Sequence, residues 1–95
     1  MYSVSVKPKT KEAMRLLKEK FNSIDDIFKS IHPKFKSKET IEDHGLKLYD
    51  WGETAQIYVH AHYDYYHLKQ TEKDVKQAIK KALGSTKNYE IKRQW

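Results

Sequence analysis

Apolar residues recur every three or four positions through the first third of the chain, at Met14, Leu17, Phe21, Ile24, Phe28 and Ile31. This spacing places them on one stripe of a helix, and such a stripe has to be buried against another layer of the protein. Asn22 and Ser23 interrupt the segment, and Ser23 followed by Asp26 has the pattern of a capping box. The sequence therefore predicts either one helix that bends here or two consecutive helices that share a core-facing side.

The segment before this stripe has a different period. Apolar and polar residues alternate over residues 2–7, which is typical of a strand with one buried face. Pro8 ends this strand, and Thr10 is placed to cap the following helix. Pro33 is expected to end the helical region at about His32.

The rest of the chain is divided by the same two periods. After a polar loop over residues 34–44, we expect a strand near residues 46–49, a turn at 50–53 and a long third strand from 55 to about 68. A helix should then begin at a Thr71/Asp74 capping box and end before Gly84. The last strand is expected over residues 89–95.

The order of these elements is β-α-β-β-α-β, which is the ferredoxin-like pattern. We therefore predict an α+β fold in which a four-stranded antiparallel sheet carries its helices on one face and leaves the other face open. With 95 residues and no linker-like tract, the chain is expected to form a single compact domain over residues 1–95.

The predicted third strand carries the most chemistry. Its small or branched apolar residues Ala55, Ile57, Val59 and Ala61 suit the face under the helices. Alternation then places the other set on the open face. That set is Tyr58, His60, His62, Asp64 and Tyr66.

Three interpretations of this row stay open. The aromatic and imidazole rings can form a platform on which unstacked bases lie, because every base has a face that stacks on a ring. The two histidines can instead serve metal or acid–base chemistry. Alternatively, the rings only pack against one another across strands, or bury themselves against a second copy or another protein.

The metal interpretation rests on His60 and His62, which lie about 6.6–7 Å apart along a strand and point the same way. This pair resembles the His-hydrophobe-His pair of replication-initiator and transposase nucleases, which also use a ferredoxin-like sheet. The resemblance implies a metal-dependent nuclease. Those enzymes place a nucleophilic tyrosine on the following helix, and residues 71–83 contain no tyrosine.

Basic residues outnumber acidic ones by 19 to 13, which gives a formal charge of +6. Four lysines gather where the sequence from residue 27 to 38 has no acidic residue, namely Lys29, Lys34, Lys36 and Lys38. A basic loop of this kind can contact phosphates, although a cation at a helix C-terminus is favourable for dipole reasons alone. Arginine, which suits bidentate recognition of bases, occurs only at positions 15 and 93. The charge therefore favours salt-sensitive backbone contacts over sequence reading.

Several functional classes are set aside. The absence of cysteine excludes disulfides, thiolate metal sites and cysteine nucleophiles. The glycines are isolated and form no phosphate-binding loop. The N-terminal residues lack the apolar run of a signal peptide, which favours a cytoplasmic protein.

We therefore expect a small basic protein that binds RNA, DNA or a nucleoprotein complex without catalysis, cofactor, metal or membrane. Its predicted contacts are Lys29, Lys34, Lys36 and Lys38, together with Tyr58, His60, His62 and Tyr66. The first alternative is a protein–protein interaction module or inhibitor, of the kind carried by phages and mobile elements, or a homodimer through the open sheet face. The second is a metal-dependent nuclease acting through His60 and His62.

Overall fold

The computed structural model describes residues 2–31, 46–61 and 65–94. Within these ranges the chain forms, in order, β1 (Tyr2–Pro8), α1 (Lys11–Glu19), α2 (Phe21–Ile31), β2 (Lys47–Asp50), β3 (Ala55–Ala61), α3 (Tyr65–Leu83) and β4 (Tyr89–Gln94). No helix in these ranges is both long enough and apolar enough to span a membrane.

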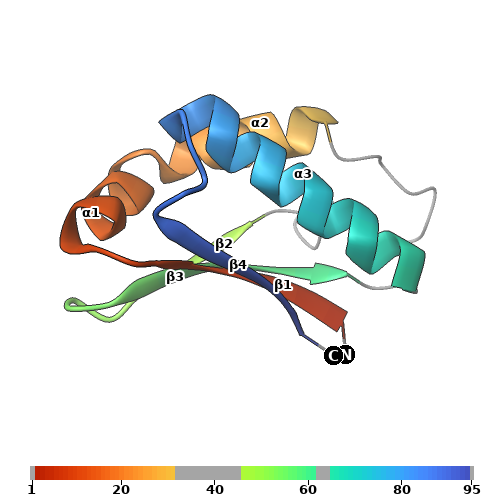
Figure 1. Cartoon of the computed structure of the whole chain (residues 1–95), viewed down its shortest axis with the longest axis horizontal. Helices are drawn as coiled ribbons and strands as arrows, with labels where there is room; N and C mark the ends of the chain where they lie inside the picture. Colours follow the sequence, from red (N-terminus) through yellow and green to blue (C-terminus); the bar gives the residue numbers. More distant parts are fainter. Residues whose placement is uncertain (1, 32–45, 62–64, 95) are drawn as a thin grey trace.

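The strands form one antiparallel sheet in the order β2-β3-β1-β4. The three helices lie on the same side of it (Figure 1). The α+β class, the four-stranded antiparallel sheet and the placement of the helices on one face are therefore confirmed. We call the sheet face opposite these helices the open face.

The apolar stripe of the first third forms two helices rather than one bent helix. The break lies at Lys20, which leaves the helical conformation, whereas the backbone N–H of Ile24 still donates to the Lys20 carbonyl at 3.0 Å. Ser23 lies inside α2, so the prediction that it caps a second helix was wrong. The predicted cap at Thr10 is confirmed, because its hydroxyl oxygen accepts the backbone N–H of Ala13 at 2.9 Å.

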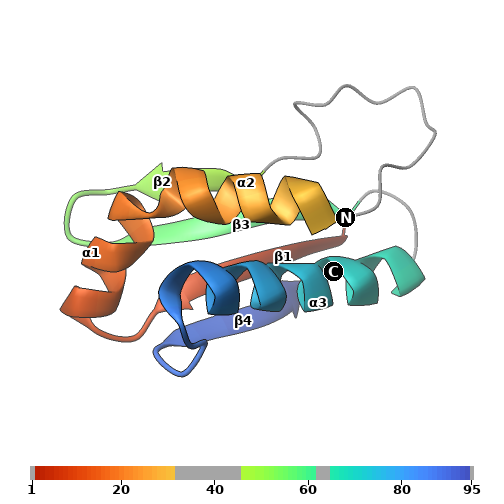
Figure 2. The same cartoon turned by 90° about the horizontal axis from the view of Figure 1, so that it is seen from above.

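The core lies between the covered face of the sheet and this stripe. Val6 of β1 and Ile57 of β3 are fully buried there, with Leu17, Ile24 and Phe28 from the first two helices. Viewed from above, α2 runs over the β2–β3 side of the sheet and α3 over the β1–β4 side (Figure 2). Burial of this apolar surface is the main contribution to folding.

The predicted third strand was wrong beyond Ala61, because the chain is already helical from Tyr65. Leu68 is fully buried and continues the helical spacing of Val75 and Ile79 toward the N-terminus. Thr71 is buried inside α3, so the predicted capping box is helix interior. The helix ends at Leu83, before Gly84 as predicted, and the Gly84 φ of 86° lies in the left-handed region that glycine adopts freely.

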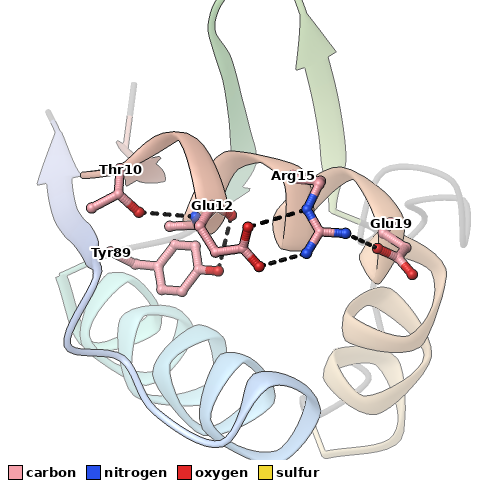
Figure 3. Close-up of polar contacts among 6 residues, drawn as sticks. Thr10, Glu12, Arg15, Glu19 and Tyr89 are labelled. Atoms are coloured by element: carbon pink, nitrogen blue, oxygen red, sulfur yellow. Dashed lines mark hydrogen bonds and ion pairs between the residues drawn. The ribbon is translucent and has the colours of Figure 1, made fainter.

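Strand β4 is tied to the start of α1 by one buried hydrogen bond. The hydroxyl of Tyr89 donates to the backbone carbonyl of Ala13 at 3.0 Å, beside the Thr10 cap (Figure 3). Burial raises the pKa of the Tyr89 hydroxyl, and the nearby Glu12 carboxylate adds to that rise. On the exposed side of α1, Arg15 pairs with Glu12 and Glu19, and exposed pairs of this kind contribute little to stability.

Replacing Tyr89 with phenylalanine should lower the free energy of unfolding by about 1 kcal/mol, because it removes one buried hydrogen bond and little apolar surface. Urea unfolding followed by circular dichroism measures this change. The matched control is Tyr49→Phe, which removes the same hydroxyl from an exposed ring and should leave the unfolding midpoint unchanged. Equal effects of the two substitutions would contradict the anchoring role of Tyr89.

Candidate functional site

Four rings lie together over β2, β3 and the turn between these strands. We call Tyr49, Trp51, Tyr58 and His60 the aromatic row. Tyr58 and His60 face away from the helices because Ile57 and Val59, their neighbours in β3, are buried beneath them. The register of the β2–β3 pair places Tyr49 opposite Gln56 and one diagonal step from Tyr58.

The rings contact one another in sequence. Trp51 stacks on Tyr49 with centroids 5.8 Å apart and planes 12° from parallel. Tyr49 meets Tyr58 edge to face at 6.1 Å. Tyr58 meets His60 edge to face at 4.8 Å, and its hydroxyl lies 3.5 Å from Nδ1 of His60, at the outer limit of hydrogen-bond distance.

These rings and Gln56 surround a shallow hollow of about 390 Å³ on the open face. Tyr49 remains 42% exposed and Trp51 61% exposed, although the two rings stack on each other. Scattered exposed hydrophobic residues are common, but neighbouring exposed rings form a contiguous patch, which is the kind of surface that marks interaction sites. We call this feature the aromatic hollow.

Next to Tyr58 and His60, the neighbouring strand β1 places only small side chains on this face, whereas its exposed Lys7 lies further along the strand, toward α1. Ser3 and Ser5 point to the open side, opposite His60 and Tyr58, yet they are only 3% and 2% exposed. The short serines lie below the level of the longer side chains on the adjacent strands. Among the residues whose side chains the structure describes, the exposed rings of this face therefore lie on the β2–β3 side.

The turn that carries Trp51 is fixed from two directions. The Asp50 carboxylate accepts the backbone N–H of Gly52 at 2.9 Å, and the backbone N–H of Trp51 donates to the Thr54 carbonyl at 2.8 Å. From α1, the Lys18 ammonium lies 3.0 Å from the Asp50 carboxylate and donates to the Gly52 carbonyl at 3.1 Å. The φ of Gly52 is 86°, which glycine adopts without strain.

The structure brings together only part of the predicted contact set. Tyr58 and His60 lie side by side on the open face as expected. Tyr66 belongs to α3, so its predicted place in the same strand row was wrong. The reason is that the helix begins at Tyr65 and ends the alternation that would have carried Tyr66 to that face.

The predicted lysines do not join this row within the described ranges. Lys29 lies in the last turn of α2, on the helical side of the sheet, and pairs with Asp25 at 2.9 Å. This contact raises the pKa of Lys29. Four predicted contact residues lie outside the described residues, namely Lys34, Lys36, Lys38 and His62.

Sequence reasoning missed Tyr49 and Trp51. Residues 50–53 were expected only to form a turn, and Tyr49 was assigned to the second strand without a functional role. A signal was nevertheless present, because the alternation that buries Leu46 and half-buries Leu48 places residues 47, 49 and 51 on the opposite side.

The charge next to the row is positive. Lys47 lies directly opposite Tyr58 in the β2–β3 register and is exposed. Among the described residues, no group of three or more His, Cys, Asp or Glu side chains is placed to hold a metal ion. The chemistry available here is ring stacking, hydrogen bonding by hydroxyl, imidazole and amide groups, and attraction of anions.

Comparison of the chain with protein-family models, with curated proteins and with solved structures found no match.

The turn should respond to acid in a defined way. The Gly52 N–H and the Lys18 ammonium hold the pKa of Asp50 below its ordinary value of 3.8. Because the folded-state pKa is lowered, these contacts stabilise the turn at neutral pH and are lost as the pH falls through the lowered pKa. The amide resonance of Gly52 in a pH titration by NMR should therefore shift with a midpoint below 3.8.

The control for this titration is Asp50→Asn, which keeps a side-chain oxygen as an acceptor and removes the titrating group. Its Gly52 resonance should not show that transition. A midpoint at or above the ordinary value in the unmodified chain would show that the carboxylate does not hold the turn.

Proposed function

We propose that this protein is a non-enzymatic binding protein whose open face holds single-stranded nucleic acid. The observation that carries the proposal is the aromatic row around its hollow, with Trp51 61% exposed at one end. Planar rings that stay accessible beside a hollow suit planar ligands, and unpaired bases are planar on both faces.

Stacking supplies affinity without sequence preference. Base–aromatic stacking contributes roughly 1–3 kcal/mol per base, measured by substitution with alanine. The Tyr49–Trp51 pair is nearly parallel, whereas the Tyr58–His60 contact is nearly perpendicular. The row thus offers ring faces at one end and ring edges with polar atoms at the other.

Net charge supports the same ligand. A formal charge of +6 attracts a polyanion. Most of the basic residues are lysines, which act as point charges rather than as the planar donors that read base edges. The proposed binding is therefore backbone-directed and salt-sensitive, with little preference for sequence.

We further propose that the strands and helices have the ferredoxin-like topology. A ferredoxin-like topology is supported by two crossovers: β1 connects to β2 through α1 and α2 with β3 lying between them, and β3 connects to β4 through α3 with β1 lying between them. A cytoplasmic location is supported by the cysteine-free composition, since an intracellular domain does not depend on disulfides.

Fluorescence anisotropy with labelled oligouridylate and oligothymidylate of about 15 nucleotides, a length near the upper end of known single-strand sites, tests this function. Affinity should fall steeply between about 50 and 200 mM salt. Trp51→Ala should weaken binding roughly 5- to 150-fold, as expected from the loss of one stacking partner. Tyr58→Ala should act in the same direction.

Two matched variants control for general effects. Trp51→Phe keeps an aromatic face and should stay within a few-fold of the unmodified protein. Lys80→Ala removes a charge from the exposed side of α3, across the sheet from the row, and should have a small effect. Absence of binding at low salt would refute the proposal.

A protein partner is the second candidate, because exposed tyrosine and tryptophan are also enriched at protein interfaces. A second copy of this chain as that partner would be indicated if the unmodified protein sedimented as a dimer, Trp51→Ala sedimented as a monomer and no oligonucleotide bound.

A further inference from the structure

A second hollow lies where β1 passes into α1, beside the β2–β3 turn. Its volume is about 470 Å³. Lys7, Lys9 and Lys11 line it together with Trp51, Gln56 and Glu53. We call it the lysine hollow.

The two hollows adjoin each other. Trp51 and Gln56 line both the lysine hollow and the aromatic hollow. A chain-like ligand that follows the row from His60 toward Trp51 therefore reaches the lysine hollow next. This places ring surface and positive charge along one path.

The lysines of the lysine hollow form no close ion pair with the described residues, although the Glu90 carboxylate, which lies opposite Lys7 in the β1–β4 register and pairs with Lys92, interacts electrostatically with Lys7 and Lys9. The lining of the hollow includes three lysines and one carboxylate, that of Glu53. Within the described ranges, none of the three ammonium groups lies within ion-pair distance of a carboxylate, whereas Lys18 and Lys29 both do. All three of these side chains are exposed.

Two backbone N–H groups near these lysines already donate hydrogen bonds within the protein. The Thr10 hydroxyl accepts the Ala13 N–H, and the Lys9 N–H donates to the Asn88 carbonyl at 2.8 Å. The segment is therefore held in place while its ammonium groups extend into the solvent. Lysine ammonium groups recognise phosphate as flexible point charges.

We propose that the lysine hollow binds backbone phosphates of the same single strand whose bases stack on the aromatic row. This inference rests on the proposed function. It adds the orientation of the bound strand, because the phosphate contacts lie at the Trp51 end of the aromatic row. Bases and phosphates then have separate places, the bases between Tyr58 and Trp51 and the phosphates among Lys7, Lys9 and Lys11.

The dependence of affinity on salt distinguishes the two halves of the site. For single strands, each phosphate neutralised by a lysine contributes a slope of roughly −0.7 to the plot of log affinity against log salt. The variant K7Q/K9Q/K11Q should therefore reduce the slope by up to about 2. Trp51→Ala should lower affinity at every salt concentration and leave the slope unchanged.

The matched control is K73Q/K80Q/K81Q, which removes the same charge from the exposed side of α3 on the helical layer. Its slope should stay close to that of the unmodified protein. The stability of every variant is first compared with that of the unmodified chain by urea unfolding. Each substituted side chain is exposed, so the fold should be preserved. The probe is oligouridylate of about 15 nucleotides throughout.

Each outcome separates the two proposals. If the unmodified protein binds and Trp51→Ala weakens binding, but the two triple variants reduce the slope equally, the aromatic function stands and the lysine hollow is refuted as the phosphate site. If the unmodified protein does not bind, both proposals fail. A selective loss of slope in K7Q/K9Q/K11Q is the expected result.

Discussion

Alternate residues of a strand point to opposite faces, and in β3 the apolar residues have to face the helices. Ile57 and Val59 are buried against the helices, and each such side chain contributes roughly 1.5–3 kcal/mol by leaving water. Turning the strand over would expose both and bury Tyr58 and His60 beneath the helices. The site on the open face is thus maintained by the packing on the covered face.

The same packing reaches the turn that carries Trp51. Leu17 of α1 is fully buried, which fixes the helix against the sheet and so fixes the position of its neighbour Lys18. Lys18 then contacts Asp50 and Gly52 in the turn. An exposed ion pair of this kind contributes little to stability. Its role is better described as positioning Trp51 over the open face.

Local periodicity in the sequence predicted most elements correctly and failed where two patterns were compatible with the same residues. Tyr58 and His60 were placed correctly because four apolar residues in β3 determine its two faces. The tyrosine-rich segment after Ala61 favours a strand by propensity, yet Leu68 belongs to the helical stripe of Val75, and tertiary burial decides in favour of the helix. A buried threonine inside α3 had the same local pattern as a cap.

The aromatic hollow and the lysine hollow could not be predicted from local sequence patterns, for a different reason. The lysine hollow combines residues distant in sequence: Lys7 and Trp51 line it together because β1 and β3 are neighbours in the sheet. No spacing of residues along the sequence predicts that these two residues lie near the same hollow. The three alternating lysines around Pro8 are visible in the sequence, but their value as a site depends on the ring beside them.

This arrangement also explains how one ligand can use both the rings and the charge. Figure 1 shows α3 on the covered side of the sheet. Its exposed lysines belong to this helical layer, whereas the aromatic row lies on the open face. A strand bound to the rings cannot contact these lysines without passing around the domain. At the Trp51 end of the row, however, the chain leaves β1 to form α1, and this connection carries lysines past the end of the sheet. That crossing places positive charge next to the open face, as our proposal of an extended ligand requires.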